Sequence, residues 1–81
     1  MRLKKGDIIF LDLEDELNSY NSDFLEYYNS VKGIFTVYRD KEDFEENFLV
    51  HDFKRKSYWD CSIHSIKIIK NYELPEELFK I

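Results

Sequence analysis

Hydrophobic and polar residues alternate along several short segments of the chain, which is typical of β-strands that bury one face. These segments are rich in β-branched and aromatic residues, which favour strands. Turn-forming residues and runs of charge separate them. The pattern predicts five short strands, at residues 8–13, 33–39, 47–53, 57–61 and 66–70. The sequence therefore indicates a mainly β fold in a single domain that spans residues 1–81.

Alternation predicts which side chains of the strands share a buried face. In the first strand Ile9, Leu11 and Leu13 fall on one face, and in the second Phe35 and Val37 do so. Apolar side chains on the opposite faces need cover from the long loop, from the segment 74–81 or from another protein. They are Ile8, Phe10, Ile34, Tyr38 and Ile69.

The remaining segments predict three short helical stretches and a hairpin. Residues 18–30 are expected to form a long loop that contains about one helical turn at 24–28, with an incomplete cap at Ser22. Residues 54–56 have the length of a hairpin tip, and residues 62–65 are expected to form a short helical turn. Pro75 at a first helical position predicts a short C-terminal helix.

The order of these features resembles the SH3-like small barrels, including their KOW and Tudor-like groups. Members open the first strand with a Gly-Asp turn and, after a long loop, start the second strand with glycine. Here those motifs are Gly6-Asp7-Ile8-Ile9 and Gly33-Ile34-Phe35-Thr36-Val37. Trp59 and the segments 50–53 and 66–68 stand at the corresponding later places. The resemblance implies a five-stranded barrel, which in such families binds nucleic acids, methyl-lysine or proteins.

Composition indicates a folded, acidic protein. Of its 81 residues 43% are hydrophobic and 36% are charged, with a net charge of −5. That charge disfavours binding to phosphate backbones, which draws its affinity from clustered cations. One cysteine and no long apolar run fit a cytoplasmic protein, monomeric or a small homo-oligomer, with no membrane partner. The bias in amino-acid composition, with no alanine and no glutamine, suggests a bacterial or phage origin.

The best functional hypothesis is a non-enzymatic interaction module that binds another protein through aromatic side chains and acidic loops. The acidic loops could also imitate DNA phosphates and so inhibit a nucleic-acid-binding protein. The candidate protein-binding residues are Phe10, Tyr20, Tyr27, Tyr28, Tyr38, Trp59, Glu14, Asp15, Glu16, Glu42, Asp43 and Glu45. A solubilising role is the simpler explanation for the acidic residues.

A nucleic-acid-associated module, similar to KOW domains, is the alternative hypothesis. It would use a basic and aromatic patch made of Lys54, Arg55, Lys56, Lys4, Lys5 and Trp59. The simpler interpretation of residues 54–56 is a solvent-exposed turn, whose charges discourage pairing with the sheet edge of another molecule.

Catalysis and metal binding have little support in the sequence. Cys61, His64 and Asp60 are close along the chain, but this spacing does not create a hydrolytic triad. The possible metal ligands are His51, Asp52, Asp60 and His64, yet no ligand motif is present. We therefore expect no enzyme activity, no metal and no cofactor.

Overall fold

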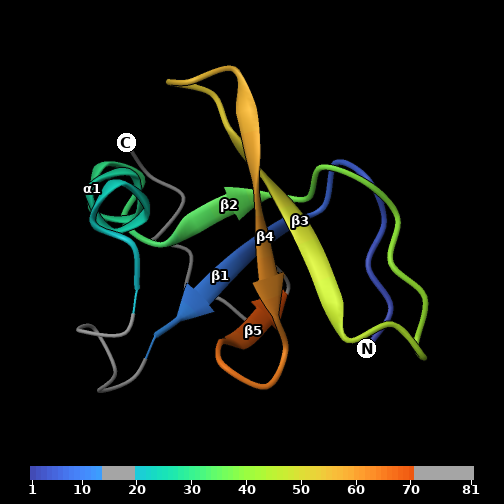
Figure 1. The fold of residues 1–81 in the computed structure, drawn as a ribbon. Helices are drawn as coiled ribbons and strands as arrows, with labels where there is room; N and C mark the ends of the chain where they lie inside the picture. Colours follow the sequence, from blue (N-terminus) through green and yellow to red (C-terminus); the bar gives the residue numbers. More distant parts are fainter. Residues whose placement is uncertain (14–19, 71–81) are drawn as a thin grey trace.

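Strands and a single helix follow one another through the part of the chain that the structure describes. The structure is a computed structural model, and it describes residues 1–13 and 20–70 (Figure 1). Its elements are β1 (Ile8–Asp12), α1 (Ser22–Ser30), β2 (Ile34–Thr36), β3 (Asn47–Asp52), β4 (Ser57–Ser62) and β5 (Lys67–Lys70). The mainly β prediction is confirmed. Over these residues, no helix has the length and apolar character needed to cross a membrane.

The strands form two antiparallel sheets, of which neither closes into a barrel. In one sheet β1 lies between β2 and β5, and in the other β3 pairs with β4. The sheets meet at a bridge between Val37 and Val50 and at a 2.8 Å hydrogen bond from the Tyr38 N–H to the Leu49 carbonyl. β2 is short because the chain then turns to pair Lys41 with Leu3. The structure therefore confirms five strands and one helix, but it does not confirm the closed SH3-like barrel.

The buried face of the strands agrees with the predicted alternation. Ile9, Leu11 and Val37 are fully buried, and Phe35 lies beside them in the core. The remaining strand residues of the core are Phe48, Val50, Cys61 and Ile68. The apolar side chains of the opposite faces are half-buried at Ile8, Phe10, Ile34 and Ile69, whereas Tyr38 is exposed. The period-2 pattern thus identified the inner face of the sheets.

The helix α1 is longer than the single turn that the sequence predicted, and its cap is Asn21, not Ser22. The Asn21 side-chain oxygen accepts a 2.7 Å hydrogen bond from the Asp23 N–H, which satisfies a donor of the first turn. The helix forms because it can bury Phe24 and Tyr27 against the core. The Phe24 ring stacks on Phe35 with centroids 5.9 Å apart.

A close approach at Gly33 joins α1 to β2. Gly33 has a φ of 77° and donates a 3.0 Å hydrogen bond from its N–H to the Tyr28 carbonyl, which ends the helix. A Cβ at this position would lie 2.7 Å from Cε2 of Phe10. Only glycine combines this backbone conformation with this contact.

The N-terminal segment before β1 contributes to the core. Leu3 is buried and exchanges two hydrogen bonds of 3.0 and 2.8 Å with Lys41. The Lys41 side chain is also buried, and its ammonium donates to the carbonyls of Met1 at 2.5 Å and Glu42 at 3.0 Å. These bonds hold the N-terminus against the connector between β2 and β3.

The two predicted turns near β4 are present. A turn over residues 53–56 joins β3 to β4, and in the turn after β4 the N–H groups of Ser65 and Ile66 both donate to the Ser62 carbonyl at 3.1 Å. The predicted helix after Pro75 lies outside the described residues.

Candidate functional site

Four rings gather on the outer surface where the two sheets meet, and we call this surface the aromatic face. It consists of Tyr38, His51, Phe53 and Tyr58. His51 lies opposite Tyr58 in the register of β3 and β4, and Tyr38 reaches both from the end of β2. The Tyr38 ring centroid is 4.8 Å from that of His51 and 4.9 Å from that of Tyr58. Phe53 stacks on His51 at 4.6 Å with an interplanar angle of 10°.

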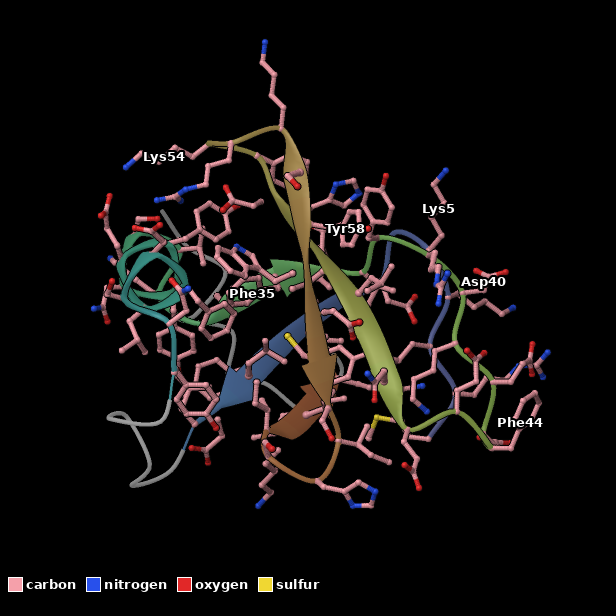
Figure 2. The ribbon with its side chains drawn as sticks, viewed as in Figure 1. Lys5, Phe35, Asp40, Phe44, Lys54 and Tyr58 are labelled. Carbon is pink, nitrogen blue, oxygen red and sulfur yellow. The ribbon has the colours of Figure 1, made fainter. Side chains whose placement is uncertain are left out.

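The aromatic face is open to solvent, although its rings are large and mostly apolar. Phe53 is 62% exposed, Tyr58 49% and Tyr38 36%. Figure 2 shows Tyr58 at the side of the β3–β4 hairpin that faces away from Phe35 in the core. Large exposed rings held in mutual contact are a common feature of binding surfaces, since they bury much area at little conformational cost.

Basic residues are close neighbours, in the fold or along the chain, of residues of the aromatic face. Lys5 is held near Tyr38 because the Gly6 N–H donates to the Val37 carbonyl at 2.9 Å and the Lys5 N–H donates to the Asp40 carboxylate at 2.8 Å. Arg39 follows Tyr38, and Lys56 precedes the strand that carries Tyr58. Over the described ranges the side chains of these three basic residues, Lys5, Arg39 and Lys56, form no ion pair.

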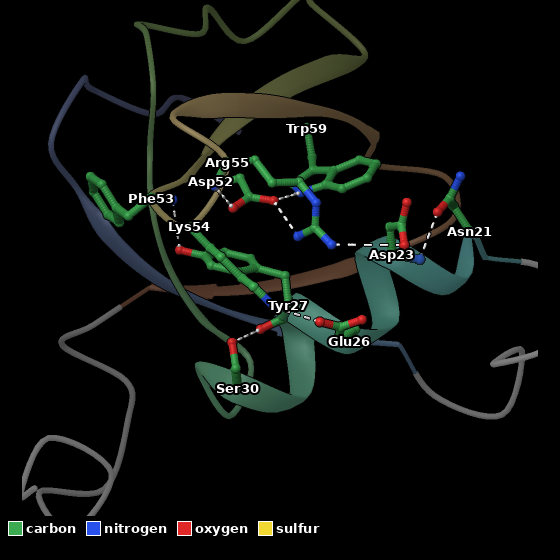
Figure 3. A network of polar contacts seen from close by, with 10 residues as sticks. All are labelled: Asn21, Asp23, Glu26, Tyr27, Ser30, Asp52, Phe53, Lys54, Arg55 and Trp59. Atoms are coloured by element: carbon green, nitrogen blue, oxygen red, sulfur yellow. Dashed lines mark hydrogen bonds and ion pairs between the residues drawn. The ribbon is translucent and has the colours of Figure 1, made fainter.

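A network of polar contacts beneath the face clamps the hairpin tip onto α1 (Figure 3). Its centre is Asp52, which is 1% exposed. The Asp52 carboxylate accepts hydrogen bonds from the Trp59 indole at 2.8 Å, from the Arg55 N–H at 3.0 Å and from the Arg55 guanidinium at 3.1 Å. Arg55 also reaches Asp23 of α1 at 3.7 Å. The charged side chain of Arg55 therefore fixes the hairpin tip to the helix.

Hydrogen bonding determines the ionisation of Asp52. Burial alone would raise the pKa of this carboxyl, because it disfavours the charged form. The hydrogen bonds from Arg55 and Trp59, together with the Arg55 charge, outweigh burial and lower the pKa below its ordinary value. The carboxylate is thus stabilised as a charged acceptor at the root of the tip.

Two further contacts hold the face in place. The Phe53 N–H donates to the Tyr27 hydroxyl at 3.1 Å, which fixes the backbone that carries one of the four rings. The Lys54 ammonium contacts Glu26 of α1 at 2.5 Å, and this pair lowers the pKa of the exposed Glu26 carboxyl. The helix supports the aromatic face from below, while the rings themselves remain free.

Most of the aromatic residues that the sequence selected for protein binding are used inside the fold. Tyr27 is buried, and Tyr20, Tyr28 and Trp59 pack against the core. The Tyr20 hydroxyl donates to the Ser65 carbonyl, and the Tyr28 hydroxyl donates to the Leu11 carbonyl, both at 2.6 Å. Burial raises the pKa of Tyr28, and the Asp12 charge adds to this effect. These rings hold α1 on the sheets.

Phe10 and Tyr38 have different environments. Phe10 is half-buried and lies against Gly33, whereas Tyr38 is part of the aromatic face. Tyr38 is therefore the predicted aromatic residue that the structure places on an open surface together with other rings.

The acidic candidates divide between a local contact network and the undescribed part of the chain. Glu42 pairs with Arg2 at 3.5 Å, and Asp43 pairs with the N-terminal amine at 3.7 Å. The Glu45 carboxylate accepts a 3.0 Å hydrogen bond from the Glu42 N–H. Glu14, Asp15 and Glu16 lie outside the described residues. The first three therefore stabilise the connector and the N-terminal segment.

The alternative basic patch is not a single free surface. Lys54 and Arg55 are paired with carboxylates of α1 and β3, which leaves Lys56 as the tip residue without an ion pair in the described ranges. Lys4 and Lys5 belong to the N-terminal segment, and Trp59 points into the core.

The cysteine and histidines do not come together with other ligands. Cys61 is buried, and burial raises the pKa of its thiol to about 12, with a further contribution from the Asp60 charge. A thiol with this pKa is a weak nucleophile. His64 pairs with Glu46 at 3.4 Å on the surface. Within residues 1–13 and 20–70, no three His, Cys, Asp or Glu side chains are placed to hold a metal ion.

Sequence reasoning missed three rings of the aromatic face, namely His51, Phe53 and Tyr58. The signal for them was present, because a two-residue period in β3 puts His51 and Phe53 opposite the inward Val50 and Asp52. The cross-strand pairing of His51 with Tyr58 follows from the hairpin register, which a turn over 53–56 fixes. Tyr38 joins them only through the contact between the two sheets.

Comparisons with known proteins assign no family. No protein-family model matches the chain, and neither a curated protein nor a solved structure is similar to it.

Proposed function

We propose that this protein is a non-enzymatic interaction module on an SH3-like barrel plan, which binds another protein through the aromatic face. The observation that carries the proposal is a continuous row of four rings, in which Tyr58 contacts Tyr38, Tyr38 contacts His51 and His51 contacts Phe53, and in which Tyr38, Phe53 and Tyr58 are solvent-exposed. Aromatic residues are enriched at interface hot spots because a rigid ring buries a large area with few torsions to fix.

The strand order supports the SH3-like part of the proposal. β5, β1 and β2 are neighbours in one sheet, β2 touches β3 at the Val37–Val50 bridge, and β3 pairs with β4. The strands therefore follow one another in the continuous order β5-β1-β2-β3-β4, with a hairpin between the third and fourth strands. The helix α1 would then belong to the long loop between the first two strands.

The binding role follows from how the face is built. The Asp52 network and the Tyr27–Phe53 hydrogen bond fix the backbone under the rings, so a partner would meet a preorganised surface. Tyr58 and Tyr38 offer hydroxyl groups at the edge of an apolar patch, which suits a partner surface with both apolar and hydrogen-bonding groups.

Comparative capture from a lysate of the source cells tests this proposal. The double variant Phe53→Ala, Tyr58→Ala removes two rings at exposed positions, and Phe44→Ala is the matched control because Phe44 is 84% exposed and lies outside the face. We expect a partner that wild type and the control retain equally and that the double variant retains at least about tenfold less. Equal retention by all three proteins would contradict the proposal.

Single-stranded nucleic acid is the second candidate ligand, and one observation favours it. The described residues contain equal numbers of acidic and basic side chains, so the net charge of −5 arises entirely from residues 14–19 and 71–81. The aromatic face, bordered by Lys5, Arg39 and Lys56, combines rings for base stacking with cations for phosphates.

Fluorescence anisotropy with oligothymidylate of about twelve nucleotides separates the two candidates. Nucleic-acid binding predicts that affinity falls steeply with salt and that Lys56→Ala weakens it more than Lys54→Ala, because Lys54 is already paired with Glu26. The protein-binding proposal predicts no measurable binding in this assay.

A further inference from the structure

β4 has one edge without a strand partner. It pairs with β3 from Ser57 to Ser62, and in the described part of the chain no strand pairs with its other edge. The unpaired edge runs beside the N-terminal end of α1, where Phe24 contacts Trp59 edge to face at 5.4 Å. This edge is separate from the aromatic face.

The register shows which backbone groups of β4 point away from β3. The Ile63 N–H donates to the Glu46 carbonyl at 2.9 Å, just beyond the last paired residues of the two strands. Because hydrogen-bonded pairs alternate along an antiparallel ladder, Cys61 and Trp59 also direct their N–H and carbonyl groups to β3. Asp60 therefore directs both its N–H and its carbonyl outward.

The neighbouring residue adds a third outward group. The Ser62 N–H points the same way as that of Asp60, whereas the Ser62 carbonyl accepts the hydrogen bonds of the following turn. Within residues 1–13 and 20–70, no interaction beyond those given above involves either backbone. The free edge of β4 thus presents the N–H and carbonyl of Asp60 and, two residues further along, the N–H of Ser62. This two-residue interval is the one at which a neighbouring strand forms its hydrogen bonds.

These groups open into a cavity. It has a volume of about 430 Å³ and is lined by the four consecutive residues Trp59 to Ser62. Consecutive residues of one strand can line the same cavity only if the strand presents its backbone edge to it, since their side chains alternate between faces. The opposite wall is aromatic and comes from Tyr20 and Phe24.

Charge adds a preference for the occupant. Asp60 is the charged residue of the cavity lining, and its carboxylate accepts a 3.1 Å hydrogen bond from Asn47. Among the described residues, that lining contains no basic side chain. A basic residue beside Asp60 and an apolar residue against Tyr20 and Phe24 would complement the two ends of the cavity.

We infer that the free edge of β4 binds an extended peptide segment of a partner protein, which adds to the β3–β4 sheet as a further strand. The peptide backbone would exchange hydrogen bonds with the N–H and carbonyl of Asp60 and accept one from the Ser62 N–H. Its alternate side chains would include an apolar residue in the aromatic cavity and a Lys or Arg next to Asp60. This site is additional to the aromatic face and does not depend on it.

Titration of ¹⁵N-labelled protein with two synthetic peptides tests the inference. The first probe is acetyl-Lys-Val-Lys-Val-Lys-Val-amide, and the second is the same peptide with N-methyl groups on its Lys residues, which removes the backbone donors of the edge that would pair with Asp60. We expect the first peptide to shift the amide resonances of Asp60 and Ser62 and to slow their hydrogen exchange at least about tenfold. The methylated peptide should leave both amides unchanged.

Protein variants test the same contact from the other side. Asp60→Asn removes the charge and should weaken the Lys peptide about two- to fivefold, while the control Asp43→Asn, with the same loss of charge on the connector, should not. Asp60→Pro removes the outward N–H without touching the β3 ladder and should abolish binding. Since that variant could fail to fold, the methylated peptide provides the equivalent loss with the wild-type chain.

Three results would overturn the inference. The first is equal binding of both peptides, which would mean that backbone pairing is not involved. The second is a shift confined to the resonances of Tyr38, His51, Phe53 and Tyr58, which would place the peptide on the aromatic face. The third is concentration-dependent self-association that protects Asp60 without peptide, because a second copy of the chain would then occupy the edge.

Discussion

At the scale of single residues, Asp52 shows how one carboxylate organises the hairpin tip. It is buried at the end of β3. Its carboxylate accepts hydrogen bonds from the Trp59 indole of β4 and from both the backbone N–H and the guanidinium of Arg55 in the turn. A buried charge is tolerated only when its hydrogen bonds and its partner charge offset the loss of hydration. The sequence showed Asp52 only as a polar residue near the end of a predicted strand, because its partners become neighbours only when the hairpin folds back.

Replacing Asp52 by Asn should lower the free energy of unfolding by about 1–3 kcal/mol, since an amide is a weaker acceptor and cannot neutralise Arg55. Urea unfolding followed by circular dichroism measures this loss. The control Asp23→Asn removes only the exposed partner of Arg55 and should change stability by less than about 1 kcal/mol. Equal losses for the two variants would contradict the central role of Asp52.

The same carboxylate should contribute to the pH dependence of stability. Its pKa is lowered in the folded protein, so its stabilisation is complete above the ordinary pKa of an aspartate, near 3.9, and is lost as the pH falls through the folded value. The stability difference between wild type and Asp52→Asn should therefore shrink below a pH of about 4. Urea midpoints measured from neutral to acidic pH check this, and a difference that stays constant would refute it.

At the scale of elements, the helix α1 determines which aromatic residues remain available. Phe24 of the helix packs on Phe35, the Tyr28 hydroxyl of the helix donates to β1, and the hydroxyl of Tyr20, just before the helix, donates to the turn after β4. A helix of nine residues is too short to be stable alone in water, so its aromatic side chains stabilise it through tertiary contacts. The prediction of exposed Tyr20, Tyr27 and Tyr28 treated this segment as a loop and could not include that packing.

The junction between α1 and β2 should be sensitive to any side chain at position 33. Gly33→Ala combines a φ of 77° with a Cβ that would lie 2.7 Å from the Phe10 ring, and we expect a loss of about 2–4 kcal/mol in unfolding free energy. Gly6→Ala is the matched control, because Gly6 has a φ of 92° but no atom within 4 Å of the added Cβ. The control should lose about 1–2 kcal/mol. Thermal unfolding of the two variants measures both losses, and a smaller loss at Gly33 than at Gly6 would show that the contact with Phe10 is unimportant.

At the scale of the whole molecule, the two sheets differ in how completely their strands are paired. β1 has a strand on each side, whereas β4 has one edge without a strand partner in the described ranges. The sheets share a core but meet at few backbone hydrogen bonds, through Val37, Tyr38 and their partners on β3. Backbone protection should follow this asymmetry.

Hydrogen exchange measured by NMR should therefore separate the strands. The amides of Ile9 and Leu11 should exchange most slowly, because β1 is central and both residues are fully buried. The amides of Tyr58 and Asp60 should exchange faster than those of Trp59 and Cys61 within the same strand, because only the latter pair with β3. Uniform protection along β4 would show that its outer edge is already covered.

The sequence by itself determined the strands, their inner faces and the hairpin, because these depend on local alternation and turn length. Ile9, Leu11, Phe35 and Val37 were identified as core residues for this reason. The mainly β prediction is confirmed with five strands in two antiparallel sheets, but these sheets do not close into the predicted barrel, because closure depends on contacts between strands far apart in the chain.

Only the tertiary structure decided which aromatic residues face solvent and which edge is free. Tyr27 and Tyr38 carry the same ring, yet Tyr27 of α1 is buried against the core, whereas Tyr38 joins His51 and Tyr58 across the two sheets. The difference arises from contacts between residues far apart in the chain. A side chain's exposure is set by what the rest of the fold places over it, and no local pattern contains that information.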